Sequence, residues 1–132
     1  MAENGVRQGK IVIPAGVNPW EHELRAAKIL ARSGYYVEFL PEGLLPRADI
    51  LLDGVEYEIK SPERFTPNTL EHTIKDALKQ SQNIIIDTSR MKKVKDMQVC
   101  NFLVRQACSR KQIKKLLLIT KQEGIIDIFK LI

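Results

Sequence analysis

Cysteines and aromatic residues are few in this sequence, and it has no long apolar run. The two cysteines, Cys100 and Cys108, are eight residues apart in one helical pattern. Their Cα atoms would then lie about 12 Å apart, which is too far for a disulfide. We expect both thiols to be buried in a protein of a reducing compartment. The sequence also lacks the Cys/His cluster that is typical of a structural zinc site.

Signals for a membrane or for secretion are missing as well. No apolar run approaches the roughly 20 residues that span a bilayer, and residues 1–5 lack the pattern of a signal peptide. We therefore expect a cytoplasmic protein with no membrane partner. The chain has 132 residues, 44% of them hydrophobic and 28% charged. It is long enough for one domain, residues 1–132, with its own apolar core.

The net charge of +5 is unevenly distributed along the chain. Between residues 90 and 115 a single acid, Asp96, stands among basic residues. These are Arg90, Lys92, Lys93, Lys95, Arg105, Arg110, Lys111, Lys114 and Lys115. Such a segment suits a polyanionic partner such as nucleic acid, although a solvated basic helix is the alternative. Because Phe102 is its one aromatic residue, the segment offers no platform for stacking unpaired bases.

Apolar periodicity and turn residues predict ten elements. The expected strands cover 10–13, 35–40, the two arms of a hairpin over 48–60, 83–87, 116–120 and 125–131. The expected helices cover 18–33, 67–82 and 91–109. Asn18 is the predicted N-cap of the first helix and Pro19 its first residue. Helices that alternate with strands indicate an α/β or α+β fold, a mixed β-sheet flanked by helices in three layers.

The hairpin over 48–60 is the most informative feature. Asp53-Gly54 is a strong signal for a two-residue turn, because both positions need positive φ. A turn there places Asp49 opposite Glu58, and Lys60 on the same face as Glu58. Two carboxylates and a lysine on one face suit metal-dependent phosphodiester cleavage. The alternative is a surface β-ribbon in which Glu56 and Glu58 face water and Lys60 pairs with Glu58.

A third carboxylate is expected from the first helix, where Glu21 and Glu23 are the candidates. At 100° per residue, Glu23 aligns with the apolar stripe of Ala27 and Leu30, whereas Glu21 aligns with solvated residues. A carboxylate on the core side is costly unless it is paired or binds a cation. We therefore favour Glu23, although it could instead complement the helix N-terminus.

In this order the motifs resemble the PD-(D/E)XK nuclease superfamily, and more narrowly the C-terminal tRNA-nuclease domains of CdiA-type contact-dependent growth inhibition toxins. The resemblance covers about residues 20–90. It is carried by His22-Glu23, Ala26-Ala27, Leu30-Ala31, Gly34-Tyr35, Val37–Pro41, Ala48–Ile50, Tyr57–Pro62, Lys79–Ser81 and Asn83–Asp87. Ala48 stands where the superfamily usually has Pro. We also expect the chain to lack the delivery region of those toxins.

The resemblance implies a restriction-endonuclease-like core, a metal-dependent nuclease acting on RNA, in particular tRNA, and a cognate inhibitor or immunity protein. It implies the catalytic residues Glu23, Asp49, Glu58, Lys60 and Gln80. Asp49, Glu58 and Glu23 would bind Mg²⁺ or Mn²⁺, with Zn²⁺ as the alternative. Nucleic acid would be held by Lys79, Arg90, Lys92, Lys93, Lys95, Lys114 and Lys115.

Other interpretations stay open at this point. Gln80 could be a solvated residue at a helix end. The whole chain could be a DNA endonuclease of a mobile element, or an inactive nucleic-acid-binding module on the same fold. It could also bind a protein through the edge of its last strand, 125–131.

Overall fold

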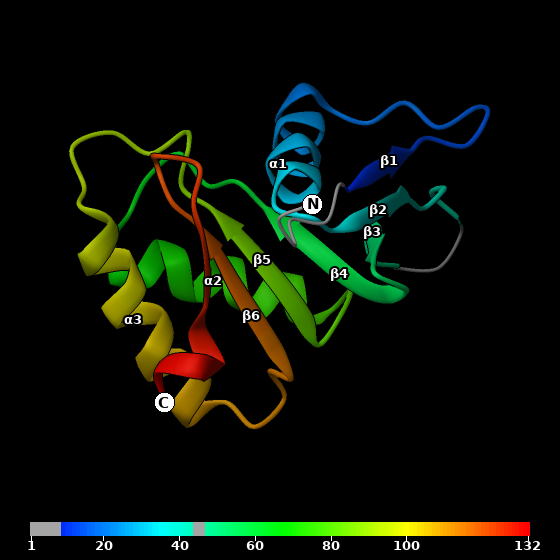
Figure 1. Cartoon of the computed structure of the whole chain (residues 1–132). Coiled ribbons are helices and arrows are strands. Elements are labelled where there is room, and N and C mark those ends of the chain that lie inside the picture. Colours follow the sequence, from blue (N-terminus) through cyan, green and yellow to red (C-terminus); the bar gives the residue numbers. More distant parts are fainter. Residues whose placement is uncertain (1–8, 44–46) are drawn as a thin grey trace.

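The computed structural model describes residues 9–43 and 47–132 (Figure 1). In this part of the chain seven strands form one curled sheet, in the order β1 to β7. They are β1 (Lys10–Val12), β2 (Tyr36–Phe39), β3 (Ile50–Leu52), β4 (Val55–Lys60), β5 (Asn83–Asp87), β6 (Lys115–Ile119) and β7 (Ile125–Asp127). β1 is parallel to β2, and β4, β5 and β6 are parallel to one another, whereas the other neighbours are antiparallel. The sheet is therefore mixed, as predicted.

Helices cover both faces of the sheet (Figure 1). α1 (Glu21–Arg32) packs on one face, and α2 (Pro67–Leu78) and α3 (Asp96–Ser109) pack on the other. A short 3₁₀ helix, η1 (Ile128–Leu131), follows β7 and contacts α3. The predicted order of strands and helices and the mixed α+β class are confirmed. Among the described residues no helix is both long and apolar enough to cross a membrane.

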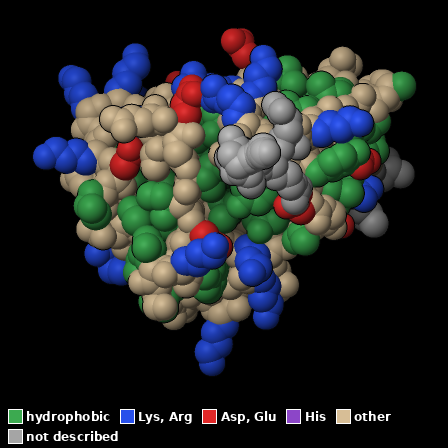
Figure 2. Space-filling model, viewed as in Figure 1, with side chains coloured by type: hydrophobic (Ala, Val, Ile, Leu, Met, Phe, Trp, Pro, Cys, Tyr) green, Lys and Arg blue, Asp and Glu red, His purple; other side chains and the backbone are tan. Residues whose placement is uncertain are grey.

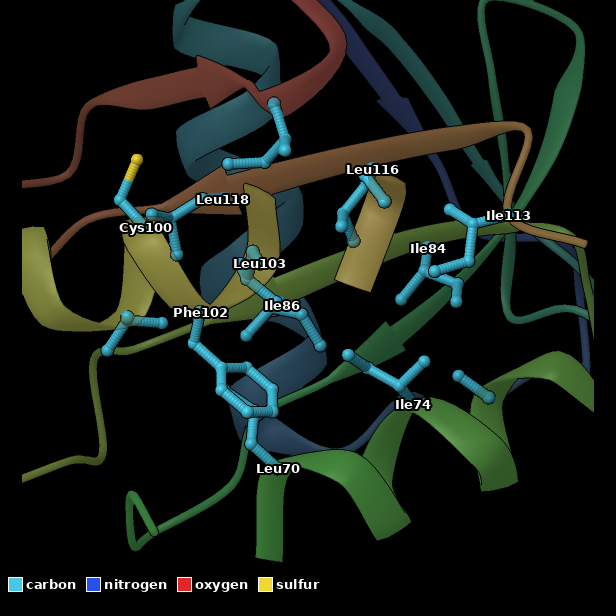
Figure 3. Close-up of a cluster of buried hydrophobic side chains, with 14 of the residues drawn as sticks. Leu70, Ile74, Ile84, Ile86, Cys100, Phe102, Leu103, Ile113, Leu116 and Leu118 are labelled. Atoms are coloured by element: carbon cyan, nitrogen blue, oxygen red, sulfur yellow. The ribbon is translucent and has the colours of Figure 1, made fainter. Parts of the chain in front are cut away.

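Two apolar cores lie on opposite faces of the sheet. Ile84 and Ile86 of β5 pack against α2 and α3 in the cluster drawn in Figure 3. Ile85, between them in sequence, belongs to the cluster beneath α1. Side chains alternate between the faces of a strand, so a strand covered on both faces needs a continuous apolar run. The strand predicted over 83–87 is confirmed for this reason.

The hairpin has the predicted register. Asp53 and Gly54 have φ of 48° and 84°, as a two-residue turn with positive φ at both positions requires. The paired residues are Leu52 with Val55, Leu51 with Glu56 and Ile50 with Tyr57. The turn is also tied to β2, because the Asp53 carboxylate accepts a hydrogen bond of 2.8 Å from the Tyr36 N–H.

Two helix starts differ from the prediction. α1 begins at Glu21 with Trp20 as N-cap, and not at Asn18-Pro19, because Trp20 has extended backbone and its N–H is bound by the Glu23 carboxylate. α3 begins at Asp96 instead of residue 91, because Lys93 has a φ of 60°, which a right-handed helix does not allow. The basic residues from 90 to 95 therefore precede α3 and do not line its outer face.

The predicted ends of two elements are also wrong, and so is the predicted burial of one thiol. α2 ends at Leu78 and not at residue 82. The last strand ends at Asp127, whose side chain accepts a hydrogen bond from the Phe129 N–H and starts η1. Cys100 is buried but Cys108 is exposed, because eight residues rotate a helix about 80° past two full turns.

Candidate active site

A cleft of about 420 Å³ opens beside the C-terminal half of β4. This volume lies within the range of about 300–1,000 Å³ that small-molecule sites occupy. Its lining comprises Trp20, His22, Glu23, Asp49, Glu58, Ile59, Lys60, Ser61, Pro62, Thr73, Asp76 and Arg90. Four of the predicted catalytic residues, Glu23, Asp49, Glu58 and Lys60, therefore meet in one cleft, although they come from α1, the start of β3, and β4.

Glu58 is the most deeply placed acid of the cleft. The register pairs Glu58 with Ile84 and Lys60 with Ile86, which puts both polar side chains on the face covered by α2 and α3. Glu58 is only 6% exposed. Its Oε2 lies 3.5 Å from the Lys60 Nζ, whereas its Oε1 is buried and has no hydrogen-bond partner within residues 9–43 and 47–132. Glu56, nearer the turn, is exposed, so the solvated ribbon describes Glu56 but not the buried Glu58.

Asp49 is anchored by the backbone of the hairpin. The ladder begins at Ile50, so Asp49 does not form the predicted direct pair with Glu58. Its N–H donates to the Tyr57 carbonyl over 3.1 Å, and its Oδ2 accepts from the Ile59 N–H over 2.9 Å. The Asp49 carboxylate thus takes the place of a backbone carbonyl as the acceptor for the β4 N–H. This hydrogen bond holds the carboxylate at the cleft.

Glu23 reaches the cleft from the first turn of α1. Its Oε1 accepts a hydrogen bond of 2.9 Å from the Trp20 N–H, which satisfies one of the free donors at a helix start. The side chain is half-buried, whereas Glu21 is exposed. Helical periodicity therefore identified which of the two acids lines the cleft, and Glu23 also complements the helix N-terminus.

Two of the three carboxyl groups, those of Glu58 and Glu23, have a raised pKa. Burial, and then the negative charge of Asp49, raise the pKa of Glu58 to about 8, although Lys60 opposes the shift. Burial also raises the pKa of Glu23, against the hydrogen bond from Trp20, and the charge of Asp49 adds to the increase. Acids held together in this way favour a shared proton or a cation.

The other predicted site residues are not all brought to the cleft. Gln80 lies in the turn after α2, and it is not among the residues that line the cleft. Lys79 does not line the cleft either, although its Nζ lies 3.4 Å from Asp76, which does. Arg90 lines the cleft directly and is held there by the Ser61 carbonyl at 3.2 Å and by Glu63 at 3.1 Å.

The remaining basic residues fall at two ends of the sheet. Lys92, Lys93 and Lys95 follow Arg90, at the C-terminal end of β5. Lys114 and Lys115 stand at the start of β6, where Lys115 pairs with Asn83 at the opposite end of β5. On the face shown in Figure 2, Lys and Arg side chains likewise stand in separate groups around the edge. The predicted nucleic-acid-binding residues are therefore divided between two ends of the sheet.

Several cleft residues were missed by sequence reasoning. Thr73 and Asp76 come from α2, and Trp20 and His22 from the start of α1. Behind the cleft, the buried Asp87 accepts a hydrogen bond of 3.2 Å from the Ser61 hydroxyl. A carboxylate that directly follows a buried apolar strand was the available sequence signal for Asp87. The others become neighbours only through tertiary packing.

The fold is shared with a solved structure, described as the CdiA-CT/CdiI toxin and immunity complex from Burkholderia pseudomallei. The TM-score is 0.68, the match covers 90% of this chain and 98% of that chain, and 20% of the residues are identical. At this identity the likeness establishes the fold alone. No match to this chain was found among curated proteins.

A family model identifies the class of protein. The model of the contact-dependent growth inhibition CdiA C-terminal domain matches residues 46–125, more than half of the chain. This chain therefore belongs to the CdiA C-terminal domain family. The matched range includes Asp49, Glu58 and Lys60, whereas Glu23 lies before it.

Proposed function

We propose that this chain is a toxin domain, residues 1–132, that cleaves RNA in the cytoplasm of a target cell, with tRNA as its substrate. The proposed site is a metal-dependent nuclease site of the PD-(D/E)XK superfamily on a restriction-endonuclease-like core. The order Asp49, Glu58, Lys60 follows that superfamily's pattern. Membership of the CdiA C-terminal domain family supports a toxin role.

One observation carries the proposal, namely the buried Oε1 of Glu58. It has no hydrogen-bond partner in the described residues and lies in a cleft with two further acids. An unpartnered buried carboxylate oxygen is unfavourable by about 1–3 kcal/mol or more. Glu58 and Asp49 would hold a divalent cation, and its charge would offset this penalty and the repulsion between two ionised carboxylates.

The donor set fits Mg²⁺ or Mn²⁺ better than Zn²⁺. Within residues 9–43 and 47–132, no group of three or more His, Cys, Asp or Glu side chains is placed so that it could hold a metal ion. Mg²⁺ commonly binds through one or two carboxylates and takes its other ligands from water and substrate phosphate. Zn²⁺ sites use three or four protein ligands. We therefore assign Asp49 and Glu58 as direct ligands and Glu23 as a ligand through water.

Each residue then has a distinct role. When bound, a divalent cation polarises the scissile phosphate and makes the attacking water more acidic. Asp49, fixed by the Ile59 N–H, and Glu58 set the position of the reacting phosphate. Lys60, about one-third exposed, orients the water and offsets the negative charge that develops on the phosphate. Arg90 holds the adjoining phosphate of the strand.

An inhibitory partner also belongs to the proposal. The structural neighbour is a complex of a toxin with its immunity protein. We therefore expect a cognate immunity protein for this chain, and an active nuclease would explain the need for one.

Cleavage assays with matched variants test the function. The wild type, Glu58→Gln and Lys60→Met would be incubated with total RNA and with plasmid DNA, in Mg²⁺, Mn²⁺, Zn²⁺ or EDTA. We expect RNA cleavage in Mg²⁺ or Mn²⁺ and none in EDTA, with a loss of about 10³-fold in Glu58→Gln. Glu56→Gln is the control, because Glu56 is exposed on the same strand and face.

The other outcomes separate the alternatives. Cleavage of DNA alone would favour a DNA endonuclease. Binding with a steep salt dependence but no cleavage would favour an inactive nucleic-acid-binding module. Equal activity in wild type and Glu58→Gln would refute the site.

Growth of bacteria that express the chain tests the toxin role. Induction of the wild type and of Glu56→Gln should arrest growth and produce tRNA fragments, whereas Glu58→Gln should be tolerated. Arrest by all three proteins at equal expression would show that toxicity does not depend on this site.

A further inference from the structure

Trp20, the only tryptophan of the sequence, lies at the cleft with its side chain largely in solvent. It is 73% exposed although it precedes a helix whose apolar face is buried. A large aromatic side chain normally contributes far more to stability when buried. The exposure of Trp20 is therefore not explained by the packing of α1.

The backbone of Trp20 is held in place on both sides. Its N–H donates to the Glu23 carboxylate over 2.9 Å, and its carbonyl accepts from the Leu24 N–H over 3.0 Å. The indole is therefore carried at a fixed point of the cleft rim. A ligand that stacks on it would not have to order the surrounding chain, which favours affinity.

Trp20 lines both the cleft and a second hollow. This hollow has a volume of about 220 Å³ and shares Trp20, Glu23 and Asp49 with the cleft. Its walls include the apolar side chains Val17 and Leu40. An indole beside a site that is proposed to bind phosphate suits a nucleobase, because every base has a π-face that stacks on aromatic rings.

A groove with three basic side chains also adjoins the cleft. Arg90 lines both the cleft and this groove, which continues past Lys28 and Arg25 of α1. The cleft thus adjoins one hollow that includes the indole of Trp20 and another that carries cationic side chains. This arrangement suits one nucleotide strand, with its base at the indole and its sugar–phosphate backbone at the cationic side chains.

We propose that Trp20 stacks against the base next to the scissile phosphate, so that the substrate must present an unpaired nucleotide. The identity of the ligand rests on the proposed nuclease function. A base within a duplex is already stacked on both faces and reaches such a platform only after extrusion from the helix. Single strands and the loops of folded RNA are therefore the substrates that this site accepts.

Fluorescence reports directly on the platform, because Trp20 is the only tryptophan. Short single-stranded RNA would be added to the Glu58→Gln protein, which binds without cleaving. We expect quenching of indole fluorescence by the single strand and none by a duplex of the same sequence. Equal quenching by the two ligands would overturn the requirement for an unpaired base.

Binding and cleavage by Trp20 variants provide the second test. Trp20→Ala should weaken binding of the single strand about 10-fold or more, whereas Trp20→Phe should stay within about 3-fold of wild type. Tyr36→Val is the control, because Tyr36 is 42% exposed and does not line the cleft. Unchanged binding and cleavage in Trp20→Ala would overturn the platform.

The two proposals can fail separately. Cleavage that is lost in Glu58→Gln but unaffected in Trp20→Ala would remove the platform and leave the nuclease. Binding that quenches Trp20 and is lost in Trp20→Ala, without cleavage by the wild type, would leave the platform and remove the nuclease.

Discussion

Neighbouring strands β4 and β5 carry opposite chemistry on the same face of the sheet. Glu58 and Lys60 lie beside Ile84 and Ile86, and all four side chains project toward the layer of α2 and α3. The two isoleucines are fully buried among apolar side chains (Figure 3). Glu58 is almost as deeply buried, but one of its oxygens has no hydrogen-bond partner among the described residues. The sequence of β5 is that of a core strand, whereas β4 carries a buried carboxylate at the same depth.

Truncation of a buried isoleucine of β5 should have the largest effect on stability. Ile84→Ala removes a side chain with no exposed surface, and it should lower the free energy of unfolding by about 2–5 kcal/mol. Urea denaturation measures the change. Ile13→Ala, at a position that is 45% exposed, should change it by less than about 0.5 kcal/mol. Equal effects would contradict the assignment of this face to the core.

On the β4 side, stability should depend on pH in metal-free buffer. Burial and the charge of Asp49 raise the pKa of Glu58 from 4.5 to about 8 in the folded state. Between these values the folded protein keeps a proton that the unfolded chain has lost. The free energy of unfolding should therefore fall as pH rises from 4.5 to about 8, by up to about 1.4 kcal/mol per unit.

Denaturation at several pH values tests this dependence. Glu58→Gln should lose this part of the pH profile, whereas the exposed control Glu56→Gln should retain it. Superimposable profiles for wild type and Glu58→Gln would mean that the carboxyl of Glu58 titrates normally.

Substitutions of Asp49 separate its structural role from its charge. Asp49→Asn keeps an oxygen that can accept from the Ile59 N–H, so we expect a stability change below about 1 kcal/mol. The pKa of Glu58 should fall, because the neighbouring negative charge is gone. Asp49→Ala should lose about 1–3 kcal/mol, because the Ile59 N–H is left without its acceptor. NMR titration of Glu58 and urea denaturation measure the two effects, and an unchanged pKa in Asp49→Asn would refute the coupling.

The smallest expected effect compares the two ends of the sheet. Arg90→Gln should reduce the salt dependence of binding to a short single strand by about 0.7 in the slope of log K against log salt. Lys115→Gln should leave that slope unchanged, because five residues of β6, about 13 Å, separate the two ends. With full-length tRNA both variants should reduce the slope. A reduction by Lys115→Gln with the short strand would place both groups at one binding surface.

The sequence predicted best what local chemistry determines. The Asp53-Gly54 turn set the register of the hairpin, and with it the shared face of Glu58 and Lys60. Helical periodicity selected Glu23 over Glu21. The apolar spacing of α3 extends N-terminally to Val94, but the helix begins only at Asp96, after the positive φ of Lys93. Periodicity alone does not detect such a backbone conformation.

Contacts between segments that are distant along the chain could not be predicted from the sequence. The Asp49 carboxylate binds the Ile59 N–H, a position in which a backbone acceptor would normally stand. The predicted helix end at residue 82 lies four residues beyond the real one at Leu78, so Gln80 falls in the turn that follows α2. The position of Trp20 at the cleft could not be predicted, because an exposed tryptophan and a buried one look the same in sequence.

The position of β4 within the sheet has a consequence for how the site moves. β4 is hydrogen-bonded to the antiparallel strand β3 on one edge and to the parallel strand β5 on the other. Amide hydrogens of such a central strand exchange with deuterium only when a large part of the fold opens, whereas edge strands exchange by local fraying. We therefore expect the amides of Glu58 and Lys60 to be among the slowest to exchange in the described residues, and those of the edge strands β1 and β7 to exchange faster.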